Sequence, residues 1–262
     1  MIAFTLVASL LALAGPTGLT ARTALVVDVE SGEVLYQRGP RGYQAIASIS
    51  KLMAMRVVLK RNLDLDAETE MLKSDVEFTR GGSRSRLKTG QRYLNVDLLH
   101  AALLGSDNRA VLALGRAVGL PRAAFTAAMN QEAKALGLAM RFGDPTGISH
   151  DNQATPQALV GLLKAAADVP MLAEVAQKST HTTRGAKGRP RITYVNTDAF
   201  AHQESRDVIV GKTGFNSSAG WCVAVMMRSA GRKLAVIVLA ARSKTARFGD
   251  ARRILSWLER RG

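Results

Sequence analysis

Strand-type patterns occur near both ends of this chain, and helix-type patterns fill its middle. Thr23–Asp28 and Val34–Gln37 flank the turn-forming stretch Glu30-Ser31-Gly32-Glu33, which predicts a hairpin. Further strand-like runs follow residue 191, at Ile192–Val195, Val208–Val210, Trp221–Met227 and Leu234–Ala240, and Ser229-Ala230-Gly231-Arg232 predicts a hairpin between the last two. Because a sheet has to bury one face against other elements, this arrangement predicts an α+β fold. Its antiparallel sheet is built from both termini and flanked by helices, and a helical subdomain is inserted into it.

Helices are predicted where apolar residues recur every three or four positions. They are expected at Ser48–Leu59, Val96–Leu104, Arg109–Val118, Ala123–Leu136, Pro156–Ala167 and Ala251–Glu259. Thr155 suits the N-cap of the fifth helix, and Pro156 suits its first turn. We expect a single domain at residues 22–262, with a sheet lobe (22–47 and 191–262) and a helical lobe (48–190).

The first 21 residues carry no charge, and Met1–Ala14 is almost wholly apolar. This run is too short to span a bilayer but suits the apolar region of a secretory signal peptide, cleaved near Ala14 or Ala21. The alternative is a buried N-terminal segment. A signal peptide at 1–21 predicts an exported, periplasmic protein without a transmembrane anchor.

The charge balance points to an anionic partner. Lys plus Arg number 36 and Asp plus Glu 21, a net charge of +15. Nucleic acid, an acidic membrane surface and an acidic polymer all fit such a charge, but export argues against nucleic acid. One Cys excludes an intramolecular disulfide and a Cys-based zinc cluster. We expect no metal and no cofactor.

Three short motifs follow one another in the order needed for serine acyl-transfer chemistry. Ser48-Ile49-Ser50-Lys51 opens a predicted helix, Ser106-Asp107-Asn108 lies between two helices, and Lys212-Thr213-Gly214 lies on a strand. The gaps are 106 − 48 = 58 and 212 − 106 = 106 residues. The same order is found in penicillin-binding proteins and class A β-lactamases. Lys88-Thr89-Gly90 repeats one motif, but it precedes Ser106 and lacks a strand, so we discount it.

The residue types of these motifs suit a nucleophilic mechanism. Ser48 is the nucleophile, and Lys51, one helical turn away, is the base once burial lowers its pKa. Ser106 can relay a proton to the leaving amine, and Asn108 can hold a substrate amide.

The third motif suits substrate binding. Lys212 supplies a cation for a substrate carboxylate, with Thr213 beside it. Gly214 lets a peptide approach the strand edge. The backbone N–H groups of Ser48 and Phe215 would form the oxyanion hole.

At these residues the chain resembles the low-molecular-mass penicillin-binding proteins, the serine D-Ala-D-Ala peptidases. It is most similar to their D-alanyl-D-alanine endopeptidase branch. The resemblance covers roughly residues 22–260 and includes Leu25–Asp28, Ile46–Met53, Ser83–Lys88, Asp144–Ser149 and Gly211–Phe215. It implies a β-lactamase/transpeptidase-like fold. The family's C-terminal β-rich stalk and anchoring helix are absent from this sequence, which fits the endopeptidase branch.

The resemblance also implies an activity. Ser48 would form an acyl-enzyme with peptidoglycan stem peptides and cleave D-alanyl cross-links, terminal D-Ala, or both, and β-lactams would acylate it. The protein is expected to be a monomer. Two alternatives stay open. One is a class A-like β-lactamase, whose deacylating Glu-x-x-Leu-Asn element is missing although Asp144 could substitute. The other is a non-catalytic basic module that binds the cell wall.

Overall fold

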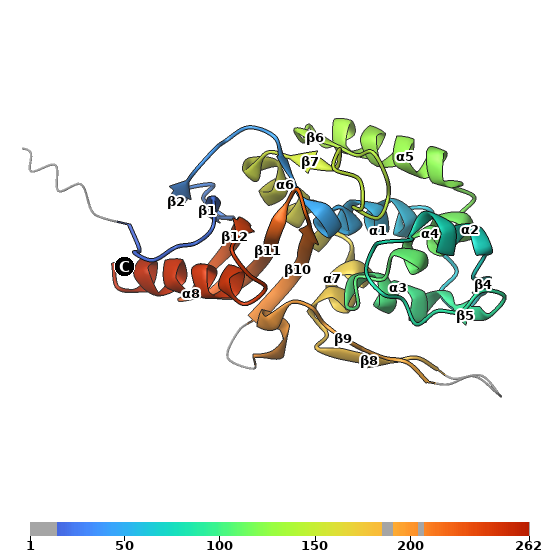
Figure 1. Cartoon of the computed structure of the whole chain (residues 1–262). Coiled ribbons are helices and arrows are strands. Elements are labelled where there is room, and N and C mark those ends of the chain that lie inside the picture. Colours follow the sequence, from blue (N-terminus) through green and yellow to red (C-terminus); the bar gives the residue numbers. More distant parts are fainter. Residues whose placement is uncertain (1–14, 185–190, 204–206, 262) are drawn as a thin grey trace, which may run out of the picture.

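The computed structural model describes residues 15–184, 191–203 and 207–261. Its largest sheet has five antiparallel strands in the order β10-β11-β12-β1-β2 (Figure 1). The strands are β1 (Thr23–Asp28), β2 (Val34–Arg38), β10 (Asp207–Asn216), β11 (Gly220–Ser229) and β12 (Arg232–Ala241). N-terminal β1 pairs with C-terminal β12, with Thr23 opposite Leu239. The prediction of an antiparallel sheet built from both ends is therefore confirmed.

Tight turns join the strands that the sequence marked as hairpins. Ser229 lies opposite Arg232 in the β11–β12 ladder. The two residues between them, Ala230 and Gly231, have φ of 48° and 75°. Positive φ at both central residues is the geometry whose twist matches that of the two strands.

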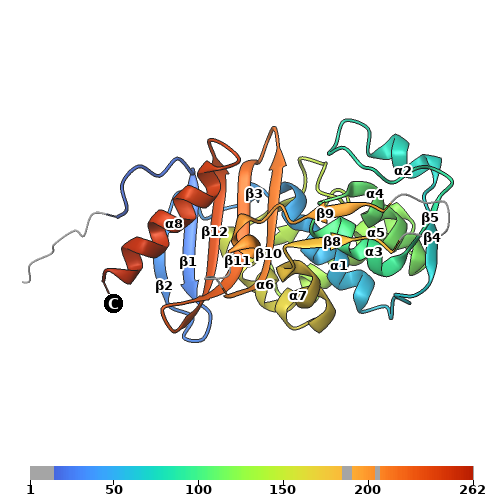
Figure 2. The ribbon, with the colours of Figure 1, turned by 90° about the horizontal axis from the view of Figure 1, so that it is seen from below.

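Helices cover both faces of the sheet, as Figure 2 shows from below. On one face, α8 (Ala246–Glu259) packs against β11 and β12, and on the other, α6 (Pro156–Ala167) packs against β1, β11 and β12. Side chains alternate along a strand, so Leu25 belongs to the core on the α6 side and Val26 to the core on the α8 side. Both faces are apolar because both are covered.

The remaining helices gather beside the sheet around α1. They are α1 (Lys51–Leu59), α2 (Lys73–Phe78), α3 (Asn95–Leu103), α4 (Asn108–Ala117), α5 (Arg122–Ala135) and α7 (Pro170–Gln177), with short 3-10 turns η1 (Ala47–Ser50) and η2 (Ala199–His202). Helix α1 is buried along most of its length and contacts α3, α4, α5, α6 and α7. It carries the first motif into the centre of the molecule.

Small sheets tie the long connections together. Strands β3 (Gln44–Ala45), β7 (Gln153–Ala154) and β6 (Met140–Arg141) form one. The pairs β4 (Glu68–Glu70) with β5 (Arg92–Leu94), and β8 (Thr180–Thr182) with β9 (Thr193–Val195), form two others. Each of these strands has two or three residues, too few for a period-2 pattern, and among them only β9 falls within a predicted strand.

The structure differs from the sequence prediction at several helix boundaries. The helix predicted from Ser48 begins as the 3-10 turn η1, and α1 starts at Lys51. Helix α8 starts at Ala246, five residues before the predicted Ala251. Gly249-Asp250 resembles a helix breaker, but burial of Phe248 and Asp250 overrides that local preference. Helices α2 and α7 were not predicted.

The predicted signal peptide lies mainly on residues 1–14, outside the described residues. Leu19 and Ala21 are buried. The Asp250 carboxylate in α8 accepts hydrogen bonds from the backbone N–H groups of Thr20 and Ala21 and from the Thr20 hydroxyl. Residues 19–21 are thus part of the folded domain. Within the described ranges, no helix has the length and apolar character needed to cross a membrane. The division into two lobes stays a prediction.

Candidate active site

Ser48 lies in a strained turn at the entrance to α1. The residue before it, Ala47, has φ of 47°, in the left-handed region that non-glycine residues seldom adopt. Ser48 is the second residue of the 3-10 turn η1, and in such a turn side chains three positions apart lie above one another. Lys51 therefore lies directly beneath Ser48, and its Nζ is 2.8 Å from the Ser48 Oγ.

The Lys51 amine has three partners and no exposure to solvent. Besides Ser48, Nζ donates to Asn108 Oδ1 at 2.7 Å and to the backbone oxygen of Thr146 at 2.5 Å. Both of these oxygens can only accept hydrogen bonds. A neutral amine has two N–H groups and one lone pair. With both N–H groups given to Asn108 and Thr146, the lone pair is left for the Ser48 hydroxyl proton.

Burial also lowers the pKa of Lys51. Desolvation brings it to about 7, although the charges of Asp144 and Asp107 oppose the shift. An amine with this pKa is substantially neutral at physiological pH, so it can accept a proton there. Geometry and pKa agree that Lys51 can act as the base predicted from the sequence.

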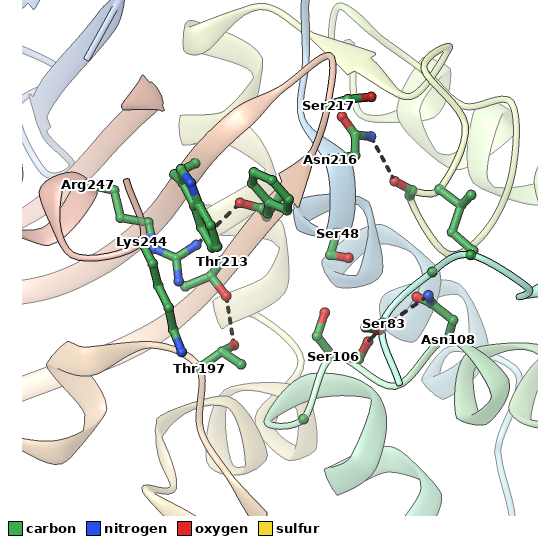
Figure 3. A pocket seen from close by; sticks show the side chains of 18 of the residues that line it. Ser48, Ser83, Ser106, Asn108, Thr197, Thr213, Asn216, Ser217, Lys244 and Arg247 are labelled. Carbon is green, nitrogen blue, oxygen red and sulfur yellow. Dashed lines mark hydrogen bonds between the residues drawn. The ribbon is translucent and has the colours of Figure 1, made fainter. Parts of the chain in front are cut away.

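The second motif faces Ser48 from the loop between α3 and α4. Ser106 has φ of 55°, and it lines the same cavity as Ser48 (Figure 3). Asn108 opens α4, and its Oδ1 is held by Lys51. Its Nδ2 donates weakly to Ser83 Oγ at 3.4 Å, so the amide N–H side faces the cavity. Asp107 caps α4 through the backbone N–H groups of Arg109 and Ala110.

The third motif lies on β10 at the edge of the sheet, beside the Ser48 turn. A Cβ on Gly214 would lie 2.5 Å from the backbone oxygen of Ile46 and 3.3 Å from the backbone nitrogen of Ser48. Only glycine allows this approach. The N–H groups of Ser48 and of Phe215, the next residue on β10, therefore lie at the same end of the cavity. This arrangement is compatible with the predicted oxyanion hole.

The structure places Lys212 behind the cavity wall rather than on it, and its predicted role as the cation for a substrate carboxylate stays a prediction. It is 1% exposed, its Nζ donates to the backbone oxygen of Thr213, and it is not part of the cavity lining. Its pKa is lowered well below its ordinary value, first by burial and then by the cations Lys51 and Arg247. The side chain of Lys212 lies on the face of β10 opposite that of Thr213 and Phe215.

Arg247, which sequence analysis did not single out, lines the cavity on the outer side of β10. Its Nη1 donates to the backbone oxygens of Gly214 and Cys222. Burial lowers its pKa to about 10, so it keeps its charge at neutral pH. Beside it, the Thr213 hydroxyl donates to Thr197 Oγ1 at 2.7 Å. Together they place a cation and hydroxyls on one wall.

Asp144 organises the loop that supplies the Thr146 carbonyl. Its Oδ1 accepts from the backbone N–H groups of Thr146 and Gly147, and its Oδ2 accepts from that of Ser149. The residue is 2% exposed and does not line the cavity. Both oxygens are therefore occupied within their own loop. This geometry gives no support to Asp144 as the water-activating carboxylate of a β-lactamase.

The cavity that these elements enclose has a volume of about 700 Å³ and is rimmed by β10, the 81–83 loop, the α3–α4 loop and the 147–150 loop. Sequence analysis missed several residues that line it, among them Ser83, Ile148, Thr197, Trp221, Lys244 and Arg247. None carries a short-range motif. Ser83 and the Asp144 segment were noted as resembling a family, without a role. In the described ranges, no group of three or more His, Cys, Asp or Glu side chains could hold a metal ion.

Comparisons with known proteins point in one direction. Residues 12–243 match the peptidase S11 family, described as D-alanyl-D-alanine carboxypeptidase. The chain is 32% identical to a D-alanyl-D-alanine endopeptidase of Escherichia coli, over 90% of this chain and 76% of that protein. It is 34% identical to a D-alanyl-D-alanine endopeptidase of Pseudomonas aeruginosa, over 92% of this chain and 78% of that protein.

Solved structures agree on the fold. A Streptomyces DD-transpeptidase superposes with a TM-score of 0.84 at 25% identity, covering 95% of this chain and all (100%) of that one. A D-alanyl-D-alanine carboxypeptidase from Mycobacterium tuberculosis superposes with a TM-score of 0.80 at 25% identity, covering 95% and 96% of the two chains. The predicted β-lactamase/transpeptidase-like architecture is therefore confirmed.

Proposed function

The chain belongs to the D-alanyl-D-alanine carboxypeptidase family, peptidase S11, and from that premise we propose that it is a serine DD-peptidase acting on peptidoglycan stem peptides. One observation carries the proposal. The Lys51 amine is buried, contacts Ser48 Oγ at 2.8 Å, and has its other two positions filled by Asn108 and Thr146. A hydroxyl and a neutral amine arranged in this way form an activated nucleophile.

Acylation follows from this geometry. A substrate peptide pairs along the free edge of β10, and its scissile carbonyl oxygen faces the N–H groups of Ser48 and Phe215. Ser48 Oγ bonds to the carbonyl carbon while its proton passes to Lys51. The C–N bond then breaks, and Ser106 relays a proton to the departing amine. Asn108 offers its amide N–H groups to the acyl side of the substrate.

Deacylation reverses these proton transfers. A water molecule attacks the ester carbonyl from the side that the amine has left, and Lys51 accepts its proton. Ser48 regains a proton as the acid departs. Asp144 is occupied within its own loop, so we assign it no part in this step.

We assign substrate recognition to the face of β10 that carries Thr213, where Arg247 also lines the cavity. When substrate binds, the Thr213 hydroxyl turns from Thr197 to the carboxylate adjacent to the scissile bond, which the Arg247 guanidinium also binds. Lys212 supports this part of the strand from behind by donating to the backbone oxygen of Thr213. An arginine with a hydroxyl beside it is a strong recogniser of a carboxylate because charge-assisted hydrogen bonds are stronger than neutral ones.

We further propose that the preferred substrate is the D-Ala–diaminopimelate cross-link, with terminal D-Ala removal as a second activity. The endopeptidase names of the Escherichia coli and Pseudomonas aeruginosa relatives support this order, whereas the family description names a carboxypeptidase. The same residues serve both reactions. The protein is proposed to be a periplasmic monomer whose Ser48 is acylated by β-lactams.

Labelling with a fluorescent penicillin tests the proposal. A stable adduct that disappears in Ser48→Ala supports a DD-peptidase. Rapid turnover of the penicillin would instead indicate a β-lactamase, and no adduct at all would leave a non-catalytic wall-binding module. Digestion of purified muropeptides then decides the scissile bond. If monomeric pentapeptides are trimmed and cross-linked dimers are not, the endopeptidase assignment is wrong.

A further inference from the structure

One wall of the active-site cavity continues outward past the residues that the mechanism uses. Thr213 and Phe215 are two positions apart on β10, so they share a face. Trp221 lies opposite Phe215 on β11, and the two rings stack with centroids 4.0 Å apart. Lys244, just before α8, also lines the cavity, and in Figure 3 its side chain points in the direction of Thr197. We call Phe215, Trp221 and Lys244 the outer wall.

Phe215 is unusual because its large apolar side chain is exposed to solvent. It is 52% exposed, one of a handful of large hydrophobic residues that solvent reaches in the described part of the chain. Its ring is held in place by Trp221, which itself lies under the Arg247 guanidinium at 5.3 Å. A rigid, exposed aromatic surface beside a catalytic cavity is the kind of surface that an aliphatic segment of a ligand can cover.

The charges around the cavity favour an anionic ligand, and two cations line it, one buried and one exposed. No Asp or Glu is among the described residues that line it. Arg247 is 2% exposed and tied to β10 by its Nη1, so it is the inner cation. Lys244 is exposed, and no carboxylate in the described ranges lies within ion-pair distance of it. It is the outer cation, and no role has been assigned to it.

The two candidate substrates differ in how many carboxylates they bring to this wall. A terminal D-Ala leaving group has one carboxylate, and nothing extends beyond it. A diaminopimelate leaving group carries the same carboxylate next to the scissile amine. An aliphatic arm follows and leads to a second stem peptide, with its own carboxylates.

We propose that Lys244 and the Phe215–Trp221 stack form a second anion subsite that binds a further carboxylate of a cross-linked leaving peptide. The diaminopimelate arm covers the exposed ring of Phe215, and the Lys244 ammonium, which also lines the cavity, binds the further carboxylate. This inference rests on the proposed peptidase function and adds a specificity determinant to it. Terminal D-Ala does not reach this subsite.

The test compares two substrates in one set of variants. Lys244→Gln should lower kcat/KM for a cross-linked dimeric muropeptide about three- to tenfold, as expected for a partly exposed charge pair. Its kcat/KM for a monomeric pentapeptide and its rate of acylation by fluorescent penicillin should stay within twofold of wild type. Lys244→Arg should restore dimer cleavage. Lys134→Gln, an exposed lysine on α5, makes the same charge change elsewhere.

A modified substrate isolates the proposed contact. When the carboxylates of the leaving peptide beyond the diaminopimelate arm are amidated, the difference between wild type and Lys244→Gln should disappear. Equal losses on dimer and monomer, or no loss on the dimer, would overturn the subsite. If the wild-type protein forms no penicillin adduct and cleaves neither substrate, the proposed function itself fails, whatever Lys244 does.

Discussion

Two regions of the active site are built in opposite ways. One is the catalytic floor, formed by Ser48 and Lys51, and the other is the outer wall. On the floor, Lys51 is buried and each of its three hydrogen-bonding positions has a partner. On the wall, Lys244 is exposed with no carboxylate within ion-pair distance in the described part of the chain. Phe215 there offers half of its surface to solvent.

This difference follows from what each region has to do. A base needs a fixed lone pair and a lowered pKa, and both require burial with every competing donor satisfied. A specificity wall needs polar and apolar groups that are still free to exchange water for a ligand. Changes on the floor should therefore affect every substrate, and changes on the wall should discriminate among substrates.

The largest expected effect comes from Lys51→Met, which keeps the length of the side chain and removes the amine. Acylation by fluorescent penicillin should slow by about a thousandfold or more, because Ser48 loses the group that accepts its proton. The rate of adduct formation measures this directly. Lys164→Met, on an exposed position of α6, should label like wild type. Labelling of Lys51→Met within tenfold of wild type would exclude Lys51 as the base.

The pH dependence of acylation is the second prediction. Burial lowers the pKa of Lys51 to about 7, and the neutral amine is the active form. The second-order rate constant should therefore rise with pH through about 7, level off above it, and fall about tenfold per unit below about pH 6. Stopped-flow labelling between pH 5 and 9, over about four units, would show this limb. A flat profile would mean that another group accepts the proton.

The sequence predicts the regular elements of the fold well because their signals are local. Thr155 accepts from the backbone N–H of Ala158, as expected of the N-cap of α6, whose range matches the prediction. The β11–β12 turn also appears where predicted. Elements that depend on distant partners were missed or misplaced. Strand β6 pairs with β7 over two residues, and α8 starts before Gly249 because its first turn packs on the sheet.

The site shows the same division. Ser48 and Lys51 are three residues apart, so one turn brings them together, and spacing alone could predict that. The Thr146 contribution is a backbone carbonyl, which leaves no residue-type signal. Arg247 reaches the cavity through the packing of α8 on β11 and β12, and no motif surrounds it.

Tertiary contacts also bear on a choice that the sequence left open. Cleavage of the proposed signal peptide near Ala14 would keep the contacts of Thr20 and Ala21 with Asp250, whereas cleavage after Ala21 would remove them. A buried carboxylate that loses its hydrogen-bond donors destabilises a fold. We therefore favour the earlier of the two cleavage sites.

Arg247→Gln should have an intermediate effect on kcat/KM. It tests whether Arg247 binds substrate or only supports β10. For peptides ending in D-Ala, kcat/KM should fall about 10- to 100-fold, because a charge-assisted contact with the terminal carboxylate is lost. The same peptide ending in D-alaninamide has no such carboxylate, so wild type and variant should cleave it at similar rates. Equal losses on both peptides would instead show that Arg247 holds β10 in place through Gly214 and Cys222.

The smallest effect on the acylation rate is expected from salt. Varying the salt concentration separates the attraction of the protein to peptidoglycan from catalysis. The net charge of +15 should draw the protein to the carboxylates of peptidoglycan, and raising salt shortens the reach of that attraction from about 10 Å at 0.1 M to about 3 Å at 1 M. Binding to purified sacculi should weaken about tenfold or more over this range. Penicillin acylation should change less than about threefold, because the contacts of Lys51 are buried and poorly screened. If binding to sacculi and penicillin acylation fell by the same factor, the catalytic floor would depend on long-range charge as much as the protein surface does. The proposed difference between the floor and the outer wall would then be wrong.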